Sequence, residues 1–83
     1  LVNARELHQA LGCNTKFVDW IKRRIKHYEF IENREYICFL NFEKAEKYGN
    51  KTTREYYLTI DMSKELCMVE NNAIAKKIRR YFI

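Results

Sequence analysis

Apolar residues recur at helical spacing in the segment 16–28, which reads KFVDWIKRRIKHY. Spacings of three and four residues place them on one stripe of a single helix. The stripe consists of Phe17, Trp20, Ile21, Ile25 and Tyr28. Because they lie on the stripe itself, we expect Phe17, Trp20 and Tyr28 to belong to the core rather than to a platform for stacking bases. Arg24 lies at its margin, where we expect it to pair with a carboxylate or stack on an aromatic ring.

A shorter helix is predicted before this segment. Asn3 can accept hydrogen bonds from the backbone N–H groups of its first turn, and Glu6, three residues later, can reach back. Gly12 suits the left-handed residue that often follows the end of a helix. Asn14 or Thr15 can then cap the second helix.

The middle of the chain has the composition of strands. Glu35–Leu40 and Arg54–Ile60 are rich in aromatic and β-branched residues. Between them lies the polar segment Asn41–Thr53, with Gly49–Asn50 as the predicted turn; part of it, Phe42–Tyr48, can instead form a helical turn. We expect two antiparallel strands joined by a long, mobile tip.

Two further helices are predicted after the hairpin. Asp61 can cap a helix that runs to about Glu70, and Asn71–Asn72 predicts a break because Asn tolerates turn conformations. A last helix from about Ala73 is expected to bury Ile74, Ile78, Tyr81 and Phe82. The order helix, helix, hairpin, helix, helix predicts one small α+β domain over residues 1–83.

The first two helices fit either a helix-turn-helix or an ordinary αα corner. Gly12 suits the turn between them, but His8 stands where the first helix of a helix-turn-helix usually needs a small residue. In a helix-turn-helix, the hairpin would be the wing of a winged-helix-like fold. The tip carries cations that could then reach phosphates: Lys44, Lys47, Lys51 and Arg54. Three acids nearly cancel this charge, so we favour a merely solvated tip: Glu43, Glu46 and Glu55.

Composition supports a folded module without a membrane span. Apolar residues make up 47% of the chain, with six Tyr, five Phe and one Trp, which suffices for one core. No apolar run approaches a membrane span. Because the chain begins at Leu1 rather than Met, we expect it to be a module of a longer protein. The family resemblance given below implies that this module is N-terminal. Its three cysteines have no paired spacing, so we expect buried thiols rather than disulfides or a zinc site.

Positive charge is concentrated on two predicted helices. The segments 16–28 and 76–80 carry +4 each, whereas the whole chain carries +5. Such faces either bind a polyanion or are simply solvated. On the strand that follows the tip, one of Tyr56 and Tyr57 must face outward, beside Arg54. The candidate nucleic-acid or partner contacts are Lys16, Lys22, Arg23, Lys26, Arg54, Tyr56, Lys76, Lys77, Arg79 and Arg80.

The sequence offers little for catalysis. His8 and His27 have no Cys or carboxylate at metal-ligand spacing, and two glycines cannot build a phosphate-binding loop. We therefore predict no enzyme, no cofactor and no metal site.

Several short segments resemble one known family. The first half contains VNAREL (2–7), KF (16–17), WI (20–21), RI (24–25), Tyr28 and Phe30. The second half contains EYYLT (55–59), DM (61–62), KEL (64–66), MVE (68–70) and RYFI (80–83). In this order they resemble phage antirepressor domains of the AntA/AntB type. Ser63 replaces an expected alanine and Ala75 an expected glycine, a loss that can straighten the bend before the last helix.

The resemblance implies a phage or prophage module that relieves repression of lytic genes in the cytoplasm of a bacterial host. A phage repressor protein is the implied target. The pattern is also similar to the KilA-N and Bro-N modules, for which binding to double-stranded DNA is expected. We therefore carry repressor binding as the first hypothesis and DNA binding as the second. A third, purely architectural module predicts a homo-oligomer.

Overall fold

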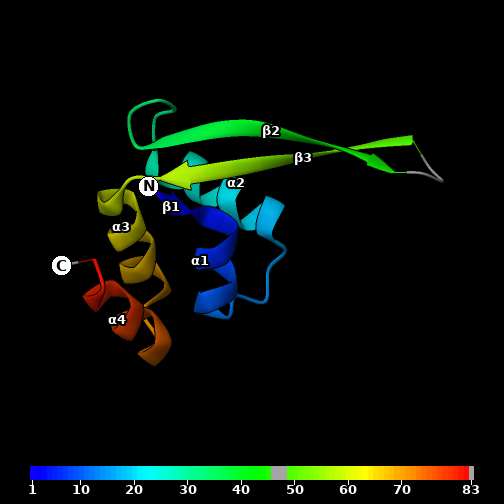
Figure 1. The fold of residues 1–83 in the computed structure, drawn as a ribbon. Helices are drawn as coiled ribbons and strands as arrows, with labels where there is room; N and C mark the ends of the chain where they lie inside the picture. Colours follow the sequence, from blue (N-terminus) through cyan, green and yellow to red (C-terminus); the bar gives the residue numbers. More distant parts are fainter. Residues whose placement is uncertain (46–48, 83) are drawn as a thin grey trace.

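A long β-hairpin runs through the middle of the chain and extends past the helices (Figure 1). The computed structural model describes residues 1–45 and 49–82, and the side chains of 1–41 and 52–82. Within these residues the elements are β1 (Val2–Asn3), α1 (Ala4–Leu11), α2 (Phe17–Tyr28), β2 (Tyr36–Ala45), β3 (Gly49–Leu58), α3 (Ile60–Glu70) and α4 (Ala73–Arg80). The described chain is thus an α+β fold, as the sequence predicted.

The strands form one antiparallel sheet in the order β1-β3-β2. The ladder between β2 and β3 continues to Ala45 opposite Gly49, so both strands extend into the segment predicted to be a tip. The predicted turn at Gly49–Asn50 is therefore wrong, and so is a helical turn over 42–45. Backbone hydrogen bonds between strands form whatever the side-chain polarity, which is why a polar segment can pair. Residues 46–48 lie outside the described chain, as do the side chains of Lys44, Lys47 and Lys51.

Asn3 and Gly12 cap α1 as predicted, but the cap predicted for α2 is wrong. The Asn3 side chain accepts hydrogen bonds from the backbone N–H groups of Arg5 and Glu6 at 2.9 and 3.1 Å. Gly12 adopts φ 68°, the left-handed conformation expected of it. The N-cap of α2 is Lys16, and no side chain caps that end, so neither Asn14 nor Thr15 does.

The cap of α3 also differs from the prediction by two residues. The Thr59 hydroxyl, not Asp61, accepts a hydrogen bond from the Met62 N–H at 3.2 Å. The helix ends at Glu70 as predicted, and the break follows at Asn71, where φ is 44°. Asn72 caps α4 by accepting from the Ala75 N–H at 2.8 Å. The bend before the last helix is therefore kept although Ala75 replaces the expected glycine.

The core lies between the sheet and the helices. Phe17 and Trp20 are buried as predicted, whereas Tyr28 is 42% exposed. Tyr28 ends the last turn of α2, and the buried Phe30 of the following segment occupies the core instead.

Helix α4 is rotated relative to the predicted stripe. Ala75 is fully buried, and Ile78 and Phe82 pack against the core, at spacings of three and four residues. The expectation that Ile74 and Tyr81 are buried is wrong, because they stand one position off this row and are 51% and 86% exposed.

Glu70 joins α2 to α3. Its Oε1 accepts hydrogen bonds from Trp20 Nε1 and from Arg24 Nη2, both at 2.9 Å, which confirms the predicted pairing of Arg24 with a carboxylate. Burial raises the pKa of Glu70, but these hydrogen bonds and the Arg24 charge outweigh it and leave the pKa below its ordinary value. The pKa of the Cys13 thiol is raised to about 11, mainly by burial and further by the Glu70 charge and a hydrogen bond to Glu70.

Candidate partner-binding surfaces

The two faces of the hairpin are different surfaces. On one face Tyr36 lies opposite Leu58 and Cys38 opposite Tyr56; we call it the inner face, because Tyr36, Tyr56 and Leu58 are buried in the core. The Phe17 ring of α2 contacts Tyr56 edge to face with ring centroids 6.1 Å apart. The opposite face, which we call the outer face, carries Ile37, Phe39, Asn41, Thr53, Glu55 and Tyr57.

A groove lies between α2 and the inner face of the hairpin. Lys22 and Lys26, one turn apart on α2, line it together with Arg54 of β3. Its volume is about 200 Å³, and the rest of its lining is Ile25, Glu32, Tyr36, Cys38 and Tyr56. We call it the basic groove. The fold thus brings together three predicted site residues that are up to 32 positions apart in the sequence.

Arg54 is charged at every ordinary pH, and its neighbours in the basic groove favour that charge further. A hydrogen bond with the Tyr56 side chain is the main reason why the pKa of Arg54 is raised above its ordinary value. Burial raises the pKa of the neighbouring Cys38 thiol, with the Arg54 charge acting in the opposite direction. One carboxylate, Glu32, faces the three cations. Such a groove can hold an anionic group of modest size, such as a phosphate.

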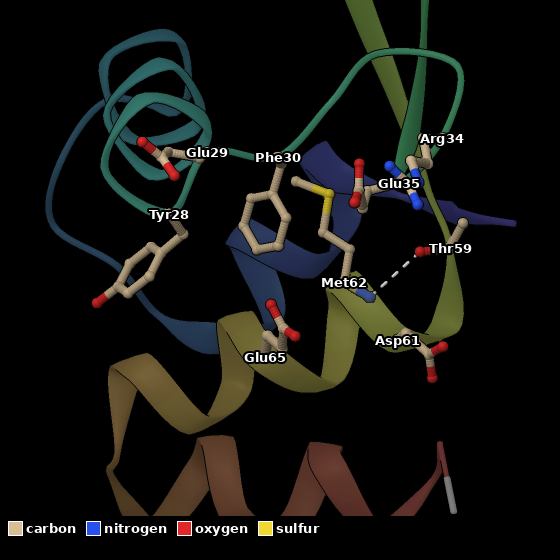
Figure 2. Close-up of a pocket in the computed structure, with 9 residues that line it drawn as sticks. All are labelled: Tyr28, Glu29, Phe30, Arg34, Glu35, Thr59, Asp61, Met62 and Glu65. Carbon is tan, nitrogen blue, oxygen red and sulfur yellow. Dashed lines mark hydrogen bonds between the residues drawn. The ribbon is translucent and has the colours of Figure 1, made fainter.

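The remaining predicted cations lie elsewhere. Lys16 is exposed at the start of α2, and Arg23 lines a separate hollow together with Arg24, Lys26 and His27. On α4, Lys77 and Arg80 line a further hollow with Tyr81, and Lys76 and Arg79 are exposed. In Figure 2, α3 lies between α2 and α4. The two basic helices therefore present separate surfaces.

Tyr56 offers little surface to a partner. It is only 6% exposed, packed between the rings of Phe17 and Tyr36, because its place in the strand alternation turns it inward. It lines the basic groove, and its contact with a partner stays a prediction. Tyr57, half-buried on the outer face, is the tyrosine of this pair that faces outward.

The outer face carries apolar residues that the predicted site did not include. Phe39 is 53% exposed, and its ring meets Tyr57 edge to face at 5.8 Å between centroids. Ile37, half-buried, lies opposite Tyr57. In Figure 1 the helices gather on the other side of the hairpin. The sequence contained a sign of this apolar outer face: apolar residues stand at consecutive positions within 35–40. A strand with one solvated face would instead alternate polar and apolar residues.

A pocket of opposite charge opens between the end of α2 and the start of α3 (Figure 2). Its volume is about 440 Å³, and Phe30 and Met62 line it among four acids and Arg34. The acids are Glu29, Glu35, Asp61 and Glu65. The Glu35 carboxylate already accepts a hydrogen bond from the Ile31 N–H at 2.6 Å. Among the described residues, no group of three or more His, Cys, Asp or Glu is placed to hold a metal ion.

The comparison with protein families shows to which family this chain belongs. A family model described as AntA/AntB antirepressor matches residues 2–72. The chain belongs to the AntA/AntB antirepressor family. This family is regulatory rather than enzymatic, and membership suggests a phage antirepressor role. No curated protein and no solved structure matches the chain.

The matched part of this antirepressor domain contains the hairpin, the basic groove and α3 but ends before α4. The segment Arg80–Ile83, which resembled the family, lies beyond the match. Nevertheless the described part of α4 completes the core through Ala75. In the described chain, no helix has the length and hydropathy needed to cross a membrane.

Proposed function

We propose that this domain relieves repression of phage lytic genes by binding a repressor protein through the outer face of its hairpin. The observation that supports this is the aromatic pair of the exposed Phe39 and the half-buried Tyr57 on a face without helices. Aromatic residues are enriched among those that dominate protein–protein binding energies. The described strand residues of this face include no cation, and the cation beside them, Arg5 of α1, is paired with Glu55 at 3.2 Å. This disfavours a phosphate backbone as the partner of the face.

Binding to the purified repressor of the same phage tests this proposal. Phe39→Ser should weaken binding at least about tenfold, the loss typical of a residue that contributes more than 1.4 kcal/mol. Met68→Ser is the matched control, since Met68 is 55% exposed on α3. Absence of repressor binding, or equal binding by both variants, would contradict the proposal.

DNA binding is the second candidate, and the basic groove favours it. In this proposal α1 and α2 form a helix-turn-helix, the hairpin is the wing, and the cations of the groove bind phosphates. Binding would weaken with salt, with a slope of log affinity against log salt of about −0.9 per neutralised phosphate.

Two double variants with the same change in net charge distinguish a DNA site in the basic groove from general attraction between a cationic protein and DNA. Lys22→Glu with Lys26→Glu should weaken DNA binding strongly and flatten the salt slope of the binding that remains. Lys76→Glu with Lys77→Glu changes the net charge equally on α4 and should have a much smaller effect. Equal losses in both double variants, or no DNA binding at low salt, would exclude the basic groove as a DNA site.

A further inference from the structure

Strand β2 is an edge strand whose outward hydrogen-bonding groups can be identified. The Thr59 N–H donates to the Glu35 carbonyl at 2.9 Å, so these opposite residues form a hydrogen-bonded pair. In an antiparallel ladder such pairs alternate with pairs whose groups point away from each other. Phe39 therefore points its N–H and C=O at β3, whereas Cys38 and Leu40 point theirs away, toward the open side of the sheet.

The start of this edge is covered. The Asn33 N–H donates to the outward carbonyl of Tyr36 at 2.6 Å, and Glu32 makes an isolated bridge to the same residue. Beyond Tyr36, no described residue pairs with β2 on this side. The open edge thus begins near Cys38, which still lies beside α2, and continues toward the end of the hairpin that extends past the helices (Figure 1).

Part of the open edge, residues 38–42, lacks the features that usually prevent strand pairing, and the charged Glu43 and Lys44 follow it. Natural edge strands carry charged residues, prolines or bulges, or they are short. The segment 38–42, CFLNF, has neither charge nor proline, and β2 is ten residues long. Phe39 is 53% exposed on the outer face and Leu40 is 66% exposed on the inner face. Both faces of the strand therefore offer apolar surface beside unpaired backbone groups.

We propose that β2 pairs antiparallel with β2 of a second copy of this chain, joining two sheets into one of six strands. A twofold axis places the same uncharged segment on both sides, so no like charges face each other within 38–42. The side chains of Phe39 and Leu40 then each gain a cross-strand neighbour from the other copy, while the two faces of the sheet stay open. This inference does not depend on the proposed repressor binding.

The net charge gives the association a distinctive salt dependence. Each copy carries +5, so two copies repel each other at low ionic strength. Salt screens this repulsion and should strengthen the dimer. DNA binding would respond in the opposite direction.

Sedimentation velocity of the chain over a range of protein concentrations tests the proposal. We expect a monomer–dimer equilibrium whose dissociation constant falls with added salt. Leu40→Pro removes only an outward N–H, and Leu40→Lys places a charge on the edge, so each should raise the dissociation constant at least about tenfold. Ile60→Lys is the matched control, because Ile60 is 52% exposed on α3.

Amide hydrogen exchange by NMR locates the contact. The Cys38 and Leu40 amides should exchange quickly in dilute protein and become protected as the protein concentration rises. The Phe39 amide, which points at β3, should be protected at both concentrations. A monomer throughout, a dimer that tolerates both Leu40 variants, or protection of these amides only on adding repressor would overturn the proposal.

Discussion

Glu70 is the residue on which the packing of α2 against α3 depends most directly. A single carboxylate oxygen accepts from both Trp20 and Arg24, and the Cys13 thiol lies beside the same group. Removing the acceptor leaves two donors in a partly buried place. The cost of such a loss is about 1–3 kcal/mol, a large part of the stability of a small domain.

We predict that Glu70→Ala lowers the free energy of unfolding by about 2 kcal/mol, whereas Glu70→Gln, which keeps an acceptor, costs less. Because the folded pKa of Glu70 is lowered, its charge stabilises the protein above the ordinary value of 4.5. This contribution is lost as the pH falls through the folded pKa. The difference between wild type and Glu70→Gln should therefore shrink in acid. Urea unfolding at pH 7 and below pH 4, followed by Trp20 fluorescence, measures it.

Glu65→Ala is the control for this series, since Glu65 is an exposed residue of the same helix. It should change stability by less than about 0.5 kcal/mol. A Glu70→Ala variant as stable as wild type would show that the Glu70 contacts contribute nothing.

At the scale of elements, side-chain caps set the limits of the helices that follow the hairpin. Thr59 caps α3, and Asn72 caps α4 directly after the left-handed Asn71. Two consecutive asparagines thus perform different tasks: the first ends one helix and the second starts the next. Because α4 has only eight residues, its own hydrogen bonds cannot hold it without this cap and its packing.

We expect Asn72→Ala to lower the free energy of unfolding by about 1 kcal/mol, the usual cost of losing an N-cap. Asn72→Asp places a carboxylate oxygen where the Asn72 amide oxygen accepts the hydrogen bond, and it should be close to wild type. Thermal unfolding followed by circular dichroism compares the three proteins. Equal stability of the Ala and Asp variants would show that this cap does not limit α4.

At the scale of the whole molecule, α4 belongs to the fold although the family match ends before it. Ala75 is fully buried, and Ile78 and Phe82 cover the core shared by α1 and α3. A small domain buries too little surface to lose such a cover without consequence. The basic residues of α4 can therefore be secondary to its role in packing.

We predict that a chain ending at Asn72 does not unfold cooperatively. Its exposed core should bind a hydrophobic dye, and its urea transition should be broad or absent. Tyr81→Ala in the intact chain is the control, because a side chain that is 86% exposed should contribute little. A cooperative transition of the shortened chain at the wild-type midpoint would refute the structural role of α4.

The sequence by itself determined the order of the four helices and the hairpin, because local signals carry that information, but it missed the two-residue strand β1. The period of apolar residues predicted α2, and Asn3, Gly12 and the break at Asn71–Asn72 marked helix ends correctly. The family resemblance rested on equally local segments. Errors of a few residues arose where several polar side chains compete for one cap, as at Thr59 and Asp61.

Only the tertiary structure decided which residues are available to a partner. Strand alternation required one of Tyr56 and Tyr57 to face outward, but packing against Phe17 made it Tyr57. The tertiary structure likewise brought Arg54 into one groove with Lys22 and Lys26, and it left one edge of β2 unpaired among the described residues. Such facts follow from contacts between distant segments. The rotation of a helix or the face of a strand is fixed by what it packs against, and no local pattern records that.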